Sequence, residues 1–179
     1  MIMTLTAELS ANPQGQTVEE LAKDTGQTVA AVKKVLKEAP YLAVQGDKYF
    51  HPDVTPCHKT QRSMGADCHV LNPITIMPGD VARVVSNLKV PEKMPDNSVI
   101  IIASRSSTYA KFGLSLTNGI GIIDADYPDH VMFEYENKTN RVVTLTHGMS
   151  IGQAMCIHAY QIWPVCNDTR TGGFGSTDK

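Results

Sequence analysis

Short runs of β-forming residues, separated by prolines and glycines, fill the chain from about residue 54 onward and constrain its fold more than any other feature. The runs lie at residues 81–85, 98–103, 121–123, 130–135, 141–146 and 153–163. Many short strands with turn signals between them are typical of an all-β sandwich or barrel. The pattern therefore predicts a mainly β domain for this part of the chain.

The first 50 residues follow a helical pattern instead. A capping box at Thr17 predicts the start of one helix, Gly26 interrupts it, and a second helix is predicted over 29–39. Apolar residues share one face of that second helix, namely Val29, Val32, Val35 and Leu36. Residues 5–10 are expected to add a preceding helix and residues 41–50 a short hairpin. Helix, tight turn, helix and hairpin together resemble a winged helix-turn-helix.

Charge leaves two roles open for this N-terminal module. Residues 1–50 carry five lysines and six acidic residues, so the module as a whole does not attract a polyanion. Three of the lysines, Lys33, Lys34 and Lys37, nevertheless cluster on the second helix. Since nucleic-acid affinity comes mostly from phosphate neutralisation, contact with DNA and a structural or subunit-contact role are both compatible with the sequence.

Length and composition set the domain organisation that we expect. The 179 residues are 42% hydrophobic and carry a net charge of −2, which allows a sizeable core without a general attraction to nucleic acid or membranes. We expect a module over 1–52, a β domain over 53–166 and a flexible tail over 167–179. No apolar run approaches the roughly 20 residues of a membrane span, and residues 1–10 lack a signal-peptide pattern. The sequence predicts a cytoplasmic protein with reduced cysteines and no membrane association.

Acidic residues occur at two points where β runs begin or end. Asp124 and Asp126 follow an apolar run, and an aspartate beside a bound water is a candidate general base. Strand alternation would place both on one face, whereas a turn rich in Asp and Gly is the alternative interpretation. Asp67, near a strand start, is a candidate ligand of hydrated Mg²⁺, which prefers carboxylates and keeps several waters.

Two other segments suit phosphate. Arg105, Ser106 and Ser107 follow an Ile-rich run and are a candidate phosphate-binding set, with a polar strand end as the alternative. The last ten residues, 170–179, contain three glycines, three hydroxyl side chains, one arginine and Phe174. Backbone N–H groups and hydroxyls bind phosphate, and an aromatic ring stacks on a base. The tail is therefore either a strap that closes over a nucleotide or a disordered terminus.

Five short motifs occur in a fixed order along the β-rich part of the chain. They are G-A-D, R-S-S, N-G-x-G-x-I-D-x-D-Y, G-x-x-I-x-Q and R-T-G-G-F-G-S-T. Their order and spacing resemble the trimeric dUTPase (dUTP diphosphatase) family over about residues 62–179. The resemblance implies a jelly-roll-like β-barrel and a homotrimer whose active sites take motifs from all three chains. It also implies hydrolysis of dUTP to dUMP and pyrophosphate with Mg²⁺.

The resemblance assigns roles by position. Asp124 would activate the water that attacks the α-phosphorus, and Asp67 would contact the metal through water. Asn118, Gly121 and Tyr127 would read the uracil edge and the deoxyribose. The remaining substrate-binding residues would be Arg105, Ser106, Ser107 and Gln153 from the barrel and Arg170, Phe174, Gly175, Ser176 and Thr177 from the strap.

The chain departs from the family pattern at several positions. Ser150 stands where a basic residue is usual, and Pro128-Asp129 follow the tyrosine of the third motif. Arg170 stands four residues before Phe174, where the family has a spacing of five. These changes concern affinity and strap geometry more than the class of reaction.

Two alternative functions remain beside the diphosphatase. The related dCTP deaminase family shares the barrel and uses a glutamate ten residues after the motif aspartate, where Glu134 stands here. That family also has a second arginine where this chain has Ala110, and it lacks the G-G-F-G-S-T strap. The other alternative is a regulatory or binding protein with the dUTPase fold that acts through its N-terminal module.

Overall fold

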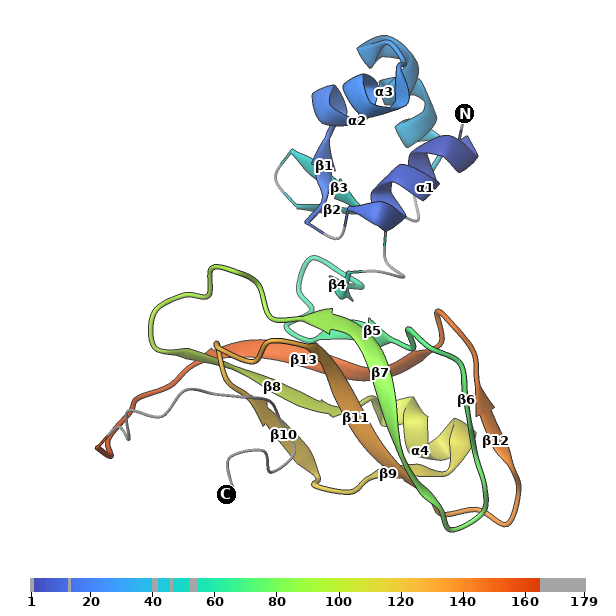
Figure 1. Ribbon diagram of the computed structural model, residues 1–179, viewed down its shortest axis with the longest axis vertical. Coiled ribbons are helices and arrows are strands. Elements are labelled where there is room, and N and C mark those ends of the chain that lie inside the picture. The colour runs from blue at the N-terminus through green and yellow to red at the C-terminus, as the bar shows by residue number, and fades with distance from the viewer. Residues whose placement is uncertain (1, 13, 40–41, 46, 52–54, 165–179) are drawn as a thin grey trace.

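The chain folds into an N-terminal module and a larger β domain (Figure 1). Each of them has a separate hydrophobic core. The computed structural model describes residues 2–12, 14–39, 42–45, 47–51 and 55–164. One core lies between Leu5 and Leu42 in the sequence and the other between Cys68 and Ala154. Each part therefore has an apolar interior of its own, as folding units do.

The N-terminal module has the element order of a winged helix-turn-helix. Its elements are α1 (Ile2–Ala11), β1 (Gln16–Thr17), α2 (Val18–Thr25), α3 (Val29–Lys37), β2 (Ala43–Gln45) and β3 (Lys48–Phe50). The strands form an antiparallel sheet in the order β1-β3-β2. The helices and the hairpin expected from the sequence are confirmed.

Local chemistry explains the turn between α2 and α3. The Thr17 hydroxyl accepts the N–H of Glu20, whose carboxylate accepts the N–H of Thr17 at 2.8 Å, so the capping box is confirmed. Gly26 ends α2 in the left-handed region with φ of 67°, which glycine adopts without steric cost. The expectation for Val29 is wrong: it is exposed, because the buried face of α3 begins one turn later at Val32.

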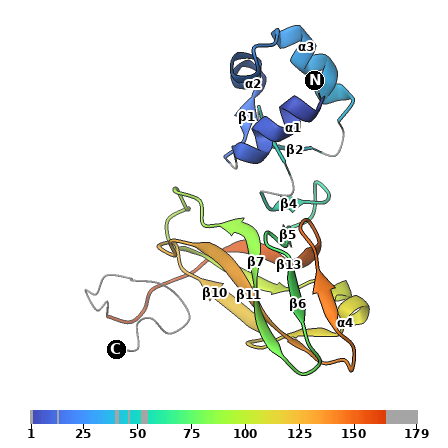
Figure 2. The same ribbon diagram turned by 45° about the vertical axis from the view of Figure 1, so that its right-hand side comes forward.

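The β domain consists of two larger sheets and a two-stranded ribbon (Figure 2). Its strands are β4 (Cys57–His58), β5 (Ala66–His69), β6 (Ile74–Ile76), β7 (Val81–Lys89), β8 (Ser98–Ser104), β9 (Leu114–Leu116), β10 (Ile120–Ile123), β11 (His130–Asn137), β12 (Val143–Leu145) and β13 (Ser150–His158). The five-stranded sheet has the order β10-β8-β13-β5-β4, and the three-stranded sheet has the order β7-β11-β9. The ribbon pairs β12 with β6.

Side chains from both sheets meet in one core. Ile102 of β8 and Ile151 of β13 face Phe133 and Tyr135 of β11, and all four are almost completely buried. The Phe133 and Tyr135 rings stack with their centroids 6.1 Å apart. The Tyr135 hydroxyl donates to the backbone oxygen of Ile151 at 2.7 Å, and burial raises the pKa of this phenol to about 12. The mainly β class predicted for this part of the chain is thus confirmed.

Three local expectations need correction. The segment after β8 forms a short helix, α4 (Ser106–Phe112), instead of a polar strand end. Strand β10 ends at Ile123, so Asp124 and Asp126 lie in the following turn and not in an alternating strand. Strand β13 ends at His158, five residues before the predicted end, because its partner β8 begins opposite it at Ser98. In the part of the chain that the structure describes, no helix is long and apolar enough to span a membrane.

Candidate functional site

A buried carboxylate links three of the residues singled out in the sequence. Asp67 lies on β5, and only 1% of its side chain is exposed. Its Oδ1 accepts a hydrogen bond from Nε2 of Gln153 at 3.0 Å, and its Oδ2 lies 3.2 Å from a guanidinium nitrogen of Arg105. Burying a carboxylate is costly unless it is paired, and here an arginine and an amide supply the pairing. The structure therefore brings Asp67, Arg105 and Gln153 together.

The surrounding elements set the direction of each of these side chains. Asp67 and Gln153 are opposite each other in the β5–β13 ladder, which places both on the same face of the sheet. Arg105 is the N-cap residue of α4, directly after β8 ends, and Ser106 and Ser107 form the first turn of that helix. Gly65 leaves room for the amide, because a Cβ there would lie 3.3 Å from Cδ of Gln153. The result is a polar corner beside the ends of β8 and β5.

Lys59 extends this corner and was not singled out in the sequence. Its Nζ lies 4.0 Å from Oδ2 of Asp67, and its side chain is 58% exposed. Two cationic side chains, Lys59 and Arg105, therefore approach the same carboxylate, and both keep donors that face solvent. Lys59 reaches this place because β4 pairs with β5, with Cys57 opposite Asp67. No sequence pattern signals a two-residue strand, so no residue-level argument would have found it.

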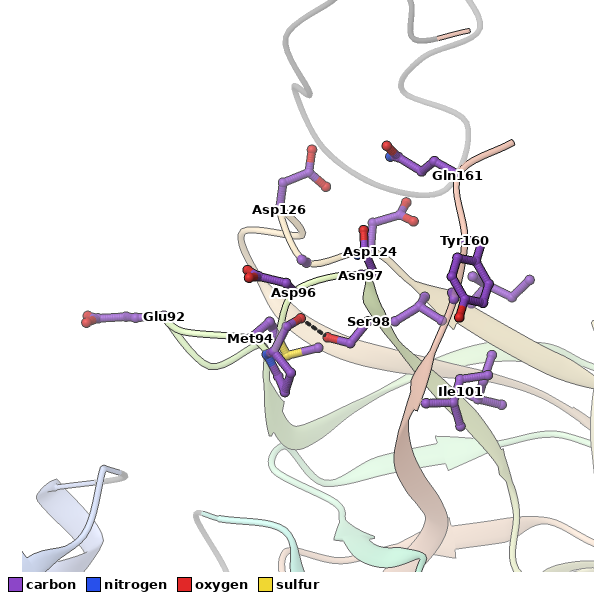
Figure 3. Close-up of a pocket in the computed structure, with 16 residues that line it drawn as sticks. Glu92, Met94, Asp96, Asn97, Ser98, Ile101, Asp124, Asp126, Tyr160 and Gln161 are labelled. Atoms are coloured by element: carbon purple, nitrogen blue, oxygen red, sulfur yellow. Dashed lines mark hydrogen bonds between the residues drawn. The ribbon is translucent and has the colours of Figure 1, made fainter. Parts of the chain in front are cut away.

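Asp124 lies in a different place, beside an open cavity of about 930 Å³ (Figure 3). It comes directly after β10 and is exposed, and Asp126 lines the same cavity. Across from them, Tyr160 and Gln161 follow the end of β13 (Figure 3). The backbone oxygen of Asp124 accepts the N–H of Tyr127 at 3.1 Å, which closes the turn that presents the carboxylate. A carboxylate that faces an open cavity can take a proton from a bound water.

The other residues of the third motif lie along the same segment. Asn118 and Gly119 form a turn, with Gly119 at φ of 70°, that carries the chain from β9 in one sheet to β10 in the other. β9 and β10 do not pair with each other, so this turn joins the two sheets. Gly121 is required by packing, because a Cβ there would lie 2.6 Å from Cγ1 of Ile102. Tyr127 packs on the main core and is only 9% exposed.

Within one chain, Asp124 and the Asp67–Arg105–Gln153 corner lie at opposite ends of strand β8. Arg105 follows the last residue of β8, whereas Ser98, its first residue, lines the cavity of Asp124. At about 3.3 Å per residue, the length of β8 separates the two places by roughly 20 Å. A single chain therefore does not bring the candidate base and the candidate phosphate ligands around one small molecule.

The sheet face between these two places is apolar and exposed. Ile101 of β8 is opposite both Ile122 of β10 and Met155 of β13, so these three side chains cross the sheet in one row. Ile120, Ile122, Met155 and Ile157 are exposed large hydrophobic residues. Contiguous apolar surface of this kind usually marks an interaction site.

Glu134, the residue that a deaminase would use, is engaged elsewhere. Its carboxylate accepts hydrogen bonds from Nε of Arg83 and from the hydroxyl of Thr117, both at 2.9 Å. The Arg83 hydrogen bond is the main reason that the pKa of Glu134 is lowered. Because Glu134 alternates with the inward-facing Phe133 and Tyr135 on β11, it lies on the outer side of the three-stranded sheet. This arrangement suits a structural ion pair better than a proton donor.

Asp67 is the candidate residue for holding a metal ion. Among the described residues, no three His, Cys, Asp or Glu side chains gather to form a metal cage. Oδ2 of Asp67 takes part in the ion pairs with Arg105 and Lys59 but accepts no hydrogen bond from the described residues, so this carboxylate keeps a lone pair for a water molecule. That donor suits Mg²⁺, which is often held through its waters by one or two carboxylates. The neighbouring Cys68 is not a competing ligand, because burial, reinforced by the Asp67 charge, raises the pKa of its thiol to about 12.

The predicted strap lies outside the described residues. This applies to Arg170, Phe174, Gly175, Ser176 and Thr177, so their expected contacts with a nucleotide stay predictions from the sequence.

Comparison with known proteins points in one direction. A family model described as dUTPase matches residues 53–177. A deoxyuridine 5'-triphosphate nucleotidohydrolase from Hahella chejuensis is 27% identical over 150 residues, covering 79% of this chain and 98% of the relative. The enzyme of the same name from Lactococcus lactis is 31% identical over 131 residues, which cover 68% of this chain and 86% of that relative.

Solved structures give the same answer for the fold. The dUTPase from Streptococcus mutans matches with a TM-score of 0.59 and 26% identity, covering 69% of this chain and 98% of that chain. A variant of the dUTPase from phage phi11 of S. aureus matches with a TM-score of 0.54 and 15% identity, covering 65% of this chain and 91% of that chain. That protein coordinates a structural Mg(II) ion. The second likeness concerns the fold alone.

Proposed function

The chain belongs to the dUTPase family, and we propose that it hydrolyses dUTP to dUMP and pyrophosphate. The observation that carries the proposal is the family match over residues 53–177, which includes all five motifs. The presentation of Asp124 at an open cavity supports it. The engagement of Glu134 with Arg83 and Thr117 favours this reaction over deamination.

Asp124 is the proposed general base. It accepts a proton from a water molecule, the water oxygen bonds to the α-phosphorus, and the bond from that phosphorus to the bridging oxygen breaks. Pyrophosphate leaves with the electron pair of the broken bond. The exposure of Asp124 and its place directly after β10 support this role, since a base must reach a water beside the substrate.

The polar corner is the proposed phosphate site. Arg105 supplies a fixed fork of donors that suits phosphate oxygens, and its ion pair with Asp67 holds the guanidinium in place. Gln153, Ser106 and Ser107 add neutral donors. Asp67 is also the residue that would hold Mg²⁺ through water, and the ion would supply charge neutralisation on the triphosphate when bound.

Base and sugar recognition is proposed for the third motif and the tail. Asn118 and the backbone near Gly121 would read the uracil edge, and Tyr127 would pack against the deoxyribose. Residues 167–179 are proposed as a strap in which Phe174 stacks on the base and Arg170, Gly175, Ser176 and Thr177 contact phosphates. We also keep residues 1–52 and 53–166 as the proposed boundaries of the module and the barrel.

A homotrimer with shared active sites is part of the proposal. The separation of roughly 20 Å between Asp124 and Arg105 supports it, because a second chain is then needed to place a base beside the phosphate ligands. The exposed apolar row around Ile101, Ile122 and Met155 supports it as well, since association would cover that surface.

A substrate panel tests the proposed reaction. With Mg²⁺, purified protein is expected to release pyrophosphate from dUTP roughly 100-fold faster than from dCTP, dTTP or UTP. Chelation by EDTA is expected to suppress the rate, and added Mg²⁺ to restore it. The measurement is pyrophosphate release with ammonia detection in parallel. Absence of dUTP turnover would refute the proposed function, and ammonia from dCTP would indicate a deaminase.

Lys59 is expected to strengthen substrate binding. Its ammonium group lies 4.0 Å from Oδ2 of Asp67 and extends the cationic corner formed with Arg105. Lys59→Ala should raise KM for dUTP roughly tenfold with little change in kcat, as expected for the loss of one charge-assisted contact. Lys59→Arg should keep most of the affinity. Lys89→Ala, which removes an exposed lysine from β7, is the matched control, and an equal KM in all variants would contradict the role.

A further inference from the structure

Helix α3 of the N-terminal module presents a cationic face to solvent. Ala30, Lys33, Lys34 and Lys37 are exposed and follow the i, i+3, i+4, i+7 spacing of one helix face. The opposite face, Val32, Val35 and Leu36, is buried in the module's core. α3 contains three lysines and no acidic residue, and one exposed acid, Glu38, follows it as the C-cap, so the outer face of the helix is net cationic.

Nothing in the described chain covers this face. In both views α3 lies at the end of the module that is farther from the β sheets (Figures 1 and 2). The described acidic side chains of the module lie outside α3, and several are engaged. Glu20 completes the capping box, and Asp24 accepts a hydrogen bond from Gln16 at 2.7 Å. The face is therefore available to a partner and takes no part in the proposed hydrolytic site.

The residues beside the lysines suit a nucleic-acid groove. Gln27 and Thr28 precede α3 and are exposed, which places polar groups at its N-terminal end. A helix about 10–12 Å across fits the major groove, which is about 12 Å wide. In the helix-turn-helix arrangement, the N-terminal end of the second helix contacts base edges.

We propose that the N-terminal module binds duplex DNA, with α3 in the major groove and Lys33, Lys34 and Lys37 against the phosphates. An acidic protein surface is the less suitable partner, because the exposed face has small and cationic residues and no aromatic side chain to act as an anchor. The net negative charge of residues 1–50 confines the attraction to this face. The proposal does not depend on dUTP hydrolysis.

Fluorescence anisotropy with a labelled 30-base-pair duplex and the full chain tests the proposal. Wild-type protein is expected to bind at 50 mM salt and to lose affinity steeply as salt rises to 200 mM. The triple variant Lys33→Ala, Lys34→Ala, Lys37→Ala should bind at least tenfold more weakly. The slope of log K against log salt should fall by about 2.7, since each phosphate contact contributes about 0.9. dUTP turnover and circular dichroism should be unchanged.

The matched control removes the same charge from the β domain through Lys89→Ala, Lys111→Ala and Lys138→Ala, and it should bind the duplex like wild type. Equal loss in both triple variants would overturn the proposal, because only total charge would then matter. So would the absence of wild-type binding at 50 mM salt. Binding of poly-glutamate as tightly as the duplex would replace the DNA assignment with an acidic-protein site.

Discussion

Asp124→Asn is expected to lower kcat for dUTP hydrolysis by about 10²- to 10⁴-fold while KM changes little. The amide keeps the shape of the side chain but cannot accept the proton of the attacking water. Because Asp124 is exposed after the end of β10, the variant should fold and melt like wild type. Single-turnover kinetics with dUTP, together with thermal denaturation, would measure both effects.

Asp126→Asn is the matched control, because Asp126 lines the same cavity two residues later. It is expected to keep kcat within a few-fold of wild type. Near-normal turnover of Asp124→Asn would assign the base elsewhere. Equal losses in the two variants would mean that the cavity needs negative charge and not one positioned base.

Gly152→Ala is expected to destabilise the β domain by about 3 kcal/mol or more, which lowers Tm by roughly 6–12 °C. A Cβ at this position would lie 2.0 Å from Cε1 and 2.5 Å from Cζ of Phe133, whose ring is completely buried. The backbone has little freedom to retreat, since Gly152 is paired with Cys68 on one side and with Ser104 on the other. Thermal and urea denaturation would measure the loss.

The variant Phe133→Leu tests whether the clash with the Phe133 ring causes the loss of stability. If the clash with the ring is responsible, the double variant Gly152→Ala, Phe133→Leu should lose less stability than the sum of the two single variants. Lys89→Ala on β7 removes an exposed side chain away from this contact and should change stability by less than about 0.5 kcal/mol. An unchanged Tm for Gly152→Ala would show that the sheet moves to accept the methyl group.

The successful sequence predictions rest on local physics. The capping box at Thr17, the interruption of the helix at Gly26 and the β run over 130–135 each involve residues within a few positions of one another. Such signals are present in the sequence itself, and the structure confirms them. The family match confirms the resemblance to dUTPases.

The incorrect predictions concern segments whose structure depends on contacts with residues distant in the sequence. The β-forming residues 159–163 were predicted to extend the last strand, but β8 offers no residue to pair with them. Val29 fits the apolar face of α3 by spacing, yet the core begins one turn later. α4 was missed because its hydroxyl-rich start resembles a strand end, while its position depends on the buried Thr108, which donates to Ile151 at 2.9 Å.

The same distinction between local and long-range information applies to the candidate site. The sequence by itself determined the helical character of the N-terminal module, the mainly β class of the rest and the residues that belong to the five motifs, because these follow from neighbouring residues and their order. Only the tertiary structure decided that Arg105 and Gln153 meet at Asp67, that Lys59 joins them, and that Asp124 lies at the other end of β8. Strand pairing joins residues up to 88 positions apart, as for Ala66 and Ala154, and no local pattern encodes which strands become neighbours.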